Sequence, residues 1–552
     1  MSSHPNAASS TQTHHNPTPT EDPVVDVVIL GGGFAGAAFA TLLGRLRPGT
    51  RSIVLEARAE GEYKVGNVGE ATVELSAFFL YRVLGLYDLL SEEHLPKHGL
   101  RYWFSSSDAT RLEEMSEVGA EHIPGIPSFQ LHRVSLERRL RELAVAEGAQ
   151  ILRPARVRNV ELAEDGPHRV CFEGESGPQS LRARWVIDAS GRNTILSRQL
   201  GLRRRVEEHP TAAVWGRWRG VKDLDGTAVL GADPRTPKLK RLGAARRLAT
   251  NHFCGRGWWA WAIPLAGGLD SIGLVWDKSR FELPGSGSKI DRYREFVTTT
   301  PGLRELLEDA EIADGDAMSY SHLPYRTERY ADRGWALVGD AAAFLDPYYS
   351  PGLDHASISI YATARLLQRQ LDGELPGDAL GEALDQHNDL FLRSYPRWLE
   401  ALYTDKYELL GDAQLTGASF LMDTALYYLG VVSPVYRDVE ALAIPLFGQP
   451  VWQATAAYKF MKTYKARLVR LAEKRQRLGL YGQRNEEWRD FSGSFGLERE
   501  SVKPLTQGIK IWAGLEWETF WASLRPGSRR PITTEPATRE VGTREVGDAS
   551  AA

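Results

Sequence analysis

The sequence predicts an α/β protein built on a doubly wound, mostly parallel sheet. Residues 24–30 form a near-continuous run of Val and Ile between turn signals, which is typical of a strand buried on both faces. A glycine-rich turn follows at once. Residues 37–46 are rich in the strong helix formers Ala and Leu, and Pro48-Gly49 stops that helix. Because residues 52–55 read as a second short strand, the ordered chain opens with a βαβ unit.

The same alternation continues along the chain. A helix is predicted around residues 136–147, and further buried strands at 150–152, 185–187 and 335–338. Residues 212–277 are β-rich, with alternating stretches such as 271–276, and predict a second, mostly antiparallel sheet. After residue 353 the pattern is helical, with many aromatic side chains, to about residue 524.

This pattern divides the chain into a doubly wound α/β domain, insertions and a helical region. The first 22 residues are rich in Ser, Thr, Pro, Asn and His, without the basic start and apolar run of a secretory signal, so they predict a disordered tail. The C-terminal end carries the doublet Thr-Arg-Glu-Val-Gly at 538 and 543 and ends in small residues. The predicted units are a tail at 1–22, a nucleotide-binding domain within 23–375 (segments 23–60, 130–195 and 320–375), substrate-domain insertions at 61–129 and 196–319, a helical region at 376–524, and a tail at 525–552.

Composition excludes several classes of function. The 552 residues are 42% hydrophobic and 25% charged, and the net charge of -4 gives no preference for nucleic acid. Cys171 and Cys254 are far apart and lack metal-ligand spacing, so no metal site is predicted and a reducing cytoplasm fits best. Residues 441–458 are uncharged, but Pro445 and Pro450 would interrupt a membrane-spanning helix. We expect a buried segment there, or alternatively an apolar wall for an acyl substrate or a bilayer surface.

A dinucleotide site is predicted at Gly31-Gly32-Gly33-Phe34-Ala35-Gly36. A glycine turn alone is weak evidence, but this one follows a strand and opens a helix, so the backbone can approach a pyrophosphate at a positively polarised helix end. Glu56 stands 20 residues after Gly36, at the end of the second strand, where a carboxylate can accept the hydroxyls of the adenosine ribose. The candidate cofactor residues of this unit are Gly31, Gly33, Phe34, Ala35, Gly36, Glu56 and Arg58.

Two further motifs favour FAD over NAD. Asp188-Ala189-Ser190-Gly191-Arg192 directly follows one predicted strand, and Gly339-Asp340 follows another and leads into a loop through Pro347. Both resemble motifs of FAD enzymes of the glutathione-reductase-like class, in which the Asp of the Gly-Asp pair contacts the ribityl and pyrophosphate region. Arg133 matches the arginine that contacts the flavin in these families. The resemblance adds Gly191, Asp340, Pro347 and Arg133 to the predicted FAD site.

Two other segments are similar to the flavin-dependent halogenases and their close monooxygenase relatives. Val68-Gly69-Glu70-Ala71-Thr72 resembles a family segment near the flavin, and Trp259-Ala260-Trp261-Ala262-Ile263-Pro264 matches the Trp-x-Trp-x-Ile-Pro signature. Tryptophan is scarce, so this spacing is improbable by chance. The resemblance implies that Glu70, Ala71 and Thr72 contact FAD and that Trp259 and Trp261 belong to the substrate or halide site.

The resemblance also implies a chemistry. In such enzymes reduced flavin reacts with oxygen, a halide is oxidised to hypohalous acid, and a lysine holds or relays the oxidant to an electron-rich substrate. An amine can donate a hydrogen bond or form a haloamine, which arginine does poorly. The tryptophan-type branch places its lysine where this chain has Phe78, whereas Lys97-His98-Gly99-Leu100-Arg101-Tyr102 fits the phenol and pyrrole branch. Lys97 is therefore the predicted catalytic residue; an ordinary surface lysine is the alternative.

One departure from the halogenases concerns the halide. Their halide site uses a Ser/Thr-Gly backbone pair after Asp-Pro, whereas this chain reads Asp346-Pro347-Tyr348-Tyr349-Ser350-Pro351-Gly352-Leu353. Pro351 removes an N–H donor where an anion would need one. Ser350 and Gly352 are the remaining candidates for a halide, and the N–H groups of Gly352 and Leu353 are candidates for the flavin pyrimidine edge.

Three functions stay open at this point. The first is a halogenase of the phenol or pyrrole type in secondary metabolism, whose aromatic substrate is either free or tethered to a carrier protein. The second is a flavin monooxygenase on the same fold, and the third is a lipid-reducing flavoprotein of the geranylgeranyl-reductase type. No second nucleotide-binding motif is found in the sequence, so a separate flavin reductase is expected to supply reduced FAD. We expect a cytoplasmic enzyme without a membrane span or nucleic-acid partner.

Overall fold

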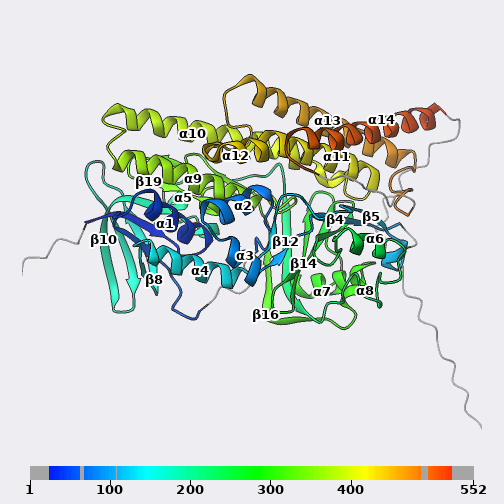
Figure 1. Ribbon diagram of the computed structural model, residues 1–552, viewed down its shortest axis with the longest axis horizontal. Coiled ribbons are helices and arrows are strands. Elements are labelled where there is room, and N and C mark those ends of the chain that lie inside the picture. Colours follow the sequence, from blue (N-terminus) through cyan, green and yellow to red (C-terminus); the bar gives the residue numbers. More distant parts are fainter. Residues whose placement is uncertain (1–23, 63–67, 107–108, 487–494, 525–552) are drawn as a thin grey trace, which may run out of the picture.

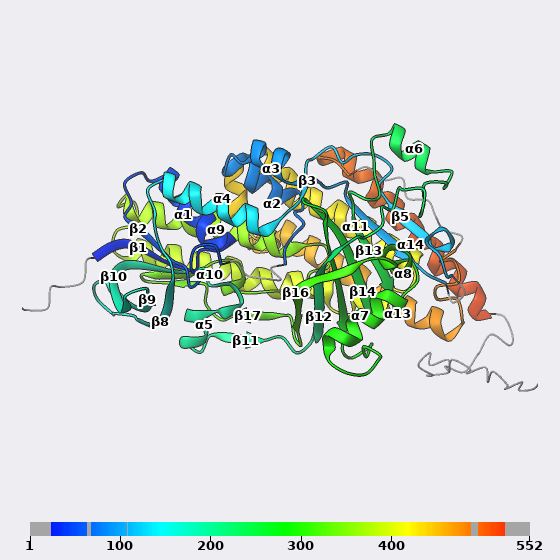
Figure 2. The ribbon, with the colours of Figure 1, turned by 90° about the horizontal axis from the view of Figure 1, so that it is seen from below.

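The structure is a computed structural model, and it describes residues 24–62, 68–106, 109–486 and 495–524. The tails predicted at 1–22 and 525–552 lie outside the described residues. Two sheets lie side by side along the long axis of the molecule, with the small β11–β17 pair between them (Figure 2). The C-terminal helices run along one side of both sheets (Figure 1). The fold is therefore mixed α/β.

The first sheet has eight strands with a parallel centre. Its order is β18-β19-β10-β1-β2-β7, with β9 pairing β10 and β8 pairing β9 in antiparallel fashion. Every strand predicted for this region is confirmed, because runs of branched apolar side chains suit a strand buried on both faces. The strands are β1 (Val24–Leu30), β2 (Ser52–Leu55), β7 (Gln150–Leu152), β8 (Ala155–Glu161), β9 (His168–Gly174), β10 (Gly177–Asp188), β18 (Ala331–Asp332) and β19 (Trp335–Leu337).

Three helices pack against or beside this sheet. Helix α1 (Phe34–Leu46) contacts both α4 (Arg133–Ala146) and α9 (Pro351–Leu371). Helix α1 is lined with Ala and Leu, and nearly all its residues up to Leu43 are buried. Helix α4 starts three residues before the predicted helix and α9 starts at Pro351, whose fixed φ suits a first helical position.

The second sheet has seven strands in the order β16-β12-β15-β14-β13-β4-β5. All adjacent pairs are antiparallel except β13–β4. One face forms a separate apolar core with α7 and α8, and the other contributes to the main core. The elements are β4 (Leu100–Phe104), β5 (Ser116–Gly119), β12 (Thr211–Arg219), β13 (Thr250–Gly255), β14 (Trp258–Leu265), β15 (Leu269–Asp277), β16 (Glu311–Tyr320), α6 (Thr236–Arg241), α7 (Lys289–Thr299) and α8 (Leu303–Leu307).

Strand β14 explains the spacing of the tryptophan motif. Side chains alternate between the faces of a strand, so residues two apart share a face. Trp259, Trp261 and Ile263 accordingly point to the main core, whereas Ala260 and Ala262 point to the other core.

The C-terminal region is helical, as predicted. Helix α11 packs against α13 and α14, and α10 contacts α9. The helices are α10 (Asp378–Trp398), α11 (Ala413–Tyr427), α12 (Ser433–Arg437), α13 (Trp452–Arg477) and α14 (Val502–Leu524). The remaining short elements are α2 (Glu74–Phe78), α3 (Tyr87–Glu93), α5 (Ile195–Gln199), β3 (Leu95–Pro96), β6 (Phe129–Gln130), β11 (Arg203–Arg205) and β17 (Tyr325–Thr327).

Two apolar stretches bear on membrane contact. The helical stretch Ala413–Arg437 is the one described helix long and apolar enough to cross a bilayer, and 72% of its most apolar window is buried inside the protein. The expectation of a buried segment at 441–458 holds only in part. Leu442 and Phe447 are buried, whereas Trp452 at the start of α13 is 75% exposed.

Candidate active site and cofactor site

The three predicted FAD motifs come together at the carboxyl edge of the parallel strands. Gly31 has a φ of +104°, and a Cβ there would lie 2.8 Å from the carbonyl oxygen of Ala189. A Cβ on Gly339 would lie 3.3 Å from the Cβ of Ala35. Segments from β1, β10 and β19 therefore touch, because these neighbouring strands run in the same direction and end at one edge.

The start of α1 has the properties of an anion site. A Cβ on Gly36 would lie 1.8 Å from the carbonyl oxygen of Gly31, so only glycine allows this tight approach of helix and strand. The first turn carries no acidic residue, and no described side chain caps the helix. Its first N–H groups are thus left for an external acceptor such as a pyrophosphate. A Cβ on Gly33 would meet little, the nearest atom being the Glu137 Oε2 at 3.9 Å, so this side of the turn is open.

Glu56 closes the glycine turn from the second strand. Its Oε2 accepts a 2.8 Å hydrogen bond from the N–H of Gly32, and its Oε1 accepts 2.7 Å and 3.1 Å bonds from the Nε and the N–H of Arg58. Burial alone would raise the pKa of Glu56, but the Arg58 charge and these bonds outweigh it and lower the pKa. Glu56 is therefore an anion at neutral pH, as ribose binding requires. Arg141, which the sequence did not single out, donates a 3.0 Å bond to the carbonyl oxygen of Gly32.

The Asp-x-Ser-Gly motif is organised by its own aspartate. The Asp188 carboxylate accepts 2.9 Å and 2.7 Å bonds from the N–H groups of Ser190 and Leu196, and burial raises the pKa of Asp188 to about 6. Gly191 has a φ of +61°, with nothing within 4 Å of the position of its missing Cβ. In the Gly-Asp motif, the Tyr325 hydroxyl donates a 2.6 Å bond to the carbonyl oxygen of Asp340. The glycine turn, Glu56 and these loops fit FAD.

Arg133 fixes the segment 68–72. Its guanidinium donates to the carbonyl oxygens of Val68 (2.7 Å) and Gly69 (3.2 Å) and to the Glu137 carboxylate (2.7 Å). Within this segment, Ala71 pairs with β6, and the buried Glu70 carboxylate accepts a 3.0 Å bond from Arg217. A Cβ on Gly69 would lie 3.9 Å from the side chain of Leu353, so the segment borders the start of α9.

The loop before α9 has an unusual backbone. Tyr349 and Ser350 have φ values of +70° and +56°, the left-handed region that non-glycine residues rarely occupy. Pro351 is the first residue of α9, where the missing N–H costs the helix nothing because that group has no partner within a helix. The N–H groups of Gly352 and Leu353 follow at the positively polarised end of α9.

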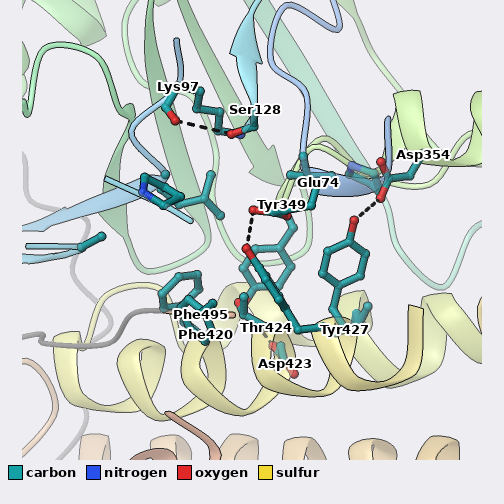
Figure 3. A pocket seen from close by; sticks show the side chains of 18 of the residues that line it. Glu74, Lys97, Ser128, Tyr349, Asp354, Phe420, Asp423, Thr424, Tyr427 and Phe495 are labelled. Carbon is teal, nitrogen blue, oxygen red and sulfur yellow. Dashed lines mark hydrogen bonds between the residues drawn. The ribbon is translucent and has the colours of Figure 1, made fainter. Parts of the chain in front are cut away.

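A cavity lies between this loop, the residues around Lys97 and helix α11 (Figure 3). Lys97 and Ser128 lie on one side, and the α11 side chains lie opposite. The lining combines apolar and aromatic walls with a few polar groups. The lining residues are Val73, Glu74, Lys97, Gly99, Leu100, Ala120, His122, Ile123, Pro124, Ser128, Tyr349, Pro351, Asp354, Trp398, Leu402, Tyr403, Phe420, Asp423, Thr424, Tyr427, Tyr428, Leu446 and Phe495.

Lys97 is a buried amine rather than a surface lysine. Its side chain is 3% exposed, and its Nζ donates a 2.7 Å bond to the carbonyl oxygen of Thr72. Burial lowers the pKa of Lys97 to about 8, against the opposing charges of Glu74 and Asp354. The amine thus titrates near neutral pH, which suits proton transfer or attack on an electrophile.

Three carboxylates of the cavity are each held by a tyrosine, and no motif in the sequence predicts these pairs. The hydroxyls of Tyr428, Tyr427 and Tyr349 donate to Glu74 (2.7 Å), Asp354 (2.7 Å) and Asp423 (3.0 Å). Burial raises the pKa of Asp354 to about 7. Asp423 also pairs with the fully buried Lys406 amine at 2.6 Å.

The residues predicted to bind substrate or halide are not themselves among the described residues that line the cavity. Trp259 and Trp261 are 2% and 6% exposed, and neither is among the described residues that line the cavity. Ser350 and Gly352 flank Pro351, which does line it. Within the described part of the chain, no group of three or more His, Cys, Asp or Glu side chains could hold a metal ion.

Comparisons with known proteins bear on the cofactor and on the reaction class. A family model described as an FAD binding domain matches residues 24–225. A flavin-dependent halogenase of Dictyostelium discoideum is 28% identical over 74% of this chain and 70% of its own length. A 1H-pyrrole-2-carbonyl-[peptidyl-carrier protein] chlorinase of Pseudomonas fluorescens is 27% identical over 60% of this chain and 73% of its own.

A solved structure shares the fold. The halogenase PltM in complex with phloroglucinol and FAD superposes with a TM-score of 0.65 at 19% identity, covering 90% of this chain and 96% of that one. The FAD-binding match includes the glycine turn, Glu56 and the motif at 188–192, and the named relatives are halogenases. The FAD-binding match and the named relatives therefore support the flavin-dependent halogenase superfamily for this chain and indicate an FAD-dependent oxidoreductase.

Proposed function

We propose that this flavin-dependent halogenase acts on a neutral, electron-rich phenol bound in the cavity beside Lys97. The observation that carries the proposal is the buried Lys97 side chain, which lines the cavity and whose amine bonds to Thr72, within the segment predicted to contact the flavin. The relatives support the reaction class, since one of them is a pyrrole chlorinase and a fold neighbour binds the phenol phloroglucinol together with FAD.

The charges of the cavity support a neutral substrate. Glu74, Asp354 and Asp423 line it, and Lys97 is the one lysine or arginine among its described lining residues. Lys406 neutralises Asp423 from outside the lining. A substrate with its own carboxylate would still meet the carboxyl groups of Glu74 and Asp354 at close range. A phenol hydroxyl, by contrast, can donate a hydrogen bond to Glu74 or Asp354, and its ring can pack against Phe420 and Phe495.

The chemistry divides between the cofactor and this chain. Bound FAD, once reduced, supplies the activation of oxygen with which a halide is oxidised to hypohalous acid. Lys97 holds that acid by a hydrogen bond and donates a proton to its oxygen, so that water leaves as the carbon–halogen bond forms. The carboxylate of Glu74 or Asp354 accepts the proton lost from the ring carbon.

The start of α9 is the proposed anion site. Pro351 removes one donor, but Ser350 and the N–H groups of Gly352 and Leu353 remain at a positively polarised helix end. These groups can hold a halide near the flavin. Because Pro351 lacks an N–H, we expect the affinity for the halide to be lower than it would be with a third backbone donor at that position.

We infer the domain organisation, the partner and the location of the enzyme from the sheet topology and the sequence. The eight-stranded sheet is interpreted as a glutathione-reductase-like doubly wound FAD domain, into which the seven-stranded sheet is inserted. A separate reductase supplies reduced FAD, because no second nucleotide motif is found in the sequence. The substrate is free or carried on a protein. The enzyme is cytoplasmic, and the burial of Ala413–Arg437 supports a core helix rather than one that crosses a membrane.

The test is the mass of the product formed by the purified holoprotein with FAD, a flavin reductase, and chloride or bromide. The substrates are phloroglucinol, an indole, and a hydroxybenzoate that adds a carboxylate to a phenol. We expect halogenated phloroglucinol and at least about 10-fold less product from the hydroxybenzoate. A product that gains one oxygen regardless of halide would establish the monooxygenase alternative instead.

A further inference from the structure

The indole of Trp259 is connected to the loop before α9 by buried hydrogen bonds. Its Nε1 donates a 2.9 Å bond to the hydroxyl of Tyr407, and that hydroxyl donates a 2.9 Å bond to the Asp346 Oδ2. The Nε2 of His209 lies 2.8 Å from the same oxygen. The other oxygen, Oδ1, accepts a 2.9 Å bond from the N–H of Tyr348. A side chain of β14 thus reaches the backbone of the loop through two intermediates.

This loop needs such support. Tyr349 and Ser350 are successive non-glycine residues in the left-handed region, a conformation that persists only when its surroundings hold it. Besides Asp346, the loop is held by the Tyr403 hydroxyl, which donates a 3.0 Å bond to the carbonyl oxygen of Tyr348. The Trp259 ring also packs edge-on against the Tyr348 ring, with centroids 5.3 Å apart.

The indole of Trp261 is connected to the other loop of the site. Its Nε1 donates a 3.0 Å bond to the hydroxyl of Ser271 on the neighbouring strand β15. The Ser271 hydroxyl also lies close enough to the Glu70 carboxylate, within the segment 68–72, to stabilise its charged form and oppose the rise in pKa that burial causes. The two indoles share one face of β14, and each reaches a different loop bordering the start of α9.

We propose that Trp259 and Trp261 are positioning residues that hold these two loops in place. Trp259 fixes residues 346–350 through Tyr407 and Asp346, and Trp261 fixes residues 68–72 through Ser271 and Glu70. Neither indole contacts the substrate, because both lie outside the cavity lining of the described chain. The expected effects on halide binding and FAD binding rest on the proposed function, whereas the role of the two indoles in holding the loops does not.

The test compares Trp259→Phe and Trp261→Phe with Trp258→Phe by hydrogen exchange. Phenylalanine keeps an aromatic ring but removes the indole N–H. Trp258 is a matched control on the same strand, because it points to the opposite core. We expect Trp259→Phe to speed amide exchange about 10-fold in peptides covering 346–353, and Trp261→Phe to do so in peptides covering 68–76. In both variants, amide exchange in the rest of the chain should match that of the wild type. In Trp258→Phe, exchange in the peptides covering 346–353 and 68–76 should also match that of the wild type.

Function provides a second readout. Trp259→Phe should raise the KM for bromide about 10-fold, and Tyr407→Phe should do the same with no further loss in the double variant, because both act through one chain of bonds. Trp261→Phe should weaken FAD binding, measured by flavin fluorescence, and leave the bromide KM unchanged. Faster exchange without a change in bromide KM would keep the positioning role and refute the halide assignment. If exchange at 346–353 and 68–76 is the same in all three variants, the inference is wrong.

Discussion

The Lys97 amine donates a 2.7 Å hydrogen bond to the carbonyl oxygen of Thr72. Thr72 is the last residue of the segment 68–72, whose Val68 carbonyl oxygen and Glu70 carboxylate accept hydrogen bonds from Arg133 and Arg217. The bond therefore joins the candidate catalytic amine to the loop predicted to contact the flavin. The Lys97 side chain also lines a cavity whose carboxylates are oriented by the tyrosine that ends α11, by Tyr428 directly after it and by Tyr349 of the loop before α9.

The buried Lys97 amine should make stability depend on pH. Its pKa is about 8 in the folded protein and 10.5 as an ordinary lysine, so the unfolded chain binds more protons between these values. The free energy of unfolding should therefore rise between pH 8 and pH 10.5, by up to about 3 kcal/mol. Urea unfolding of the wild type and Lys97→Met at pH 8 and 10.5 measures this. Equal pH dependence in both proteins would mean that the amine is not buried.

Asp354 should produce the opposite dependence at lower pH. Burial raises its pKa from 3.8 to about 7, so its contribution to stability is complete below pH 4 and is lost as the pH rises through 7. Compared with Asp354→Asn, the wild type should lose up to about 4 kcal/mol of unfolding free energy between pH 4 and pH 8. Tyr427→Phe removes the hydroxyl that stabilises the carboxylate and should shift this loss to higher pH. A pH-independent difference between wild type and Asp354→Asn would contradict the assignment.

Much of the fold could be predicted because its signals are local. The strands at 24–30 and 52–55, the glycine turn and the motifs at 188–192 and 339–340 each consist of a few adjacent residues with a distinctive composition. Parallel strands then bring these motifs to one edge without further information. The tryptophan motif was recognised in the same way.

The remainder of the site could not be predicted because its contacts are distant in sequence. Tyr427 lies 73 residues after Asp354, and Tyr428 lies 354 residues after Glu74. No spacing rule connects such pairs. The roles predicted for Trp259 and Trp261 came from a family pattern, which does not reveal which way their indole N–H groups point. Those roles, like that of Lys97, stay predictions.

The Lys406–Asp423 pair should be strongly coupled. Lys406 is fully buried and its amine lies 2.6 Å from the carboxylate of Asp423, which also holds Tyr349. Lys406→Met leaves a buried carboxylate without its cation and should lower the free energy of unfolding by about 3–5 kcal/mol. The double variant Lys406→Met/Asp423→Asn should recover most of that loss. A double variant as unstable as the sum of its single changes would show that the two side chains act independently.

The glycine turn allows a test of the cofactor site itself. A Cβ on Gly36 would lie 1.8 Å from the carbonyl oxygen of Gly31, whereas a Cβ on Gly33 would meet only Glu137 at 3.9 Å. Gly36→Ala should therefore destabilise the apoprotein. Gly33→Ala should keep the apoprotein's melting temperature but weaken FAD binding about 10-fold or more, because its methyl group lies where the pyrophosphate approaches. Unchanged FAD affinity in Gly33→Ala would place the pyrophosphate elsewhere.

We claim that Lys97 holds hypohalous acid beside the substrate and protonates its oxygen, and removing the amine tests this role. Wild type and Lys97→Met are each supplied with FAD, a flavin reductase, bromide and phloroglucinol, and the products are analysed by mass spectrometry while oxygen uptake is recorded. We predict the paired isotope pattern of bromine in the wild-type product, and a loss of at least about 100-fold in Lys97→Met at unchanged oxygen uptake. Full bromination by Lys97→Met, or an oxygenated product from the wild type, would contradict the claim.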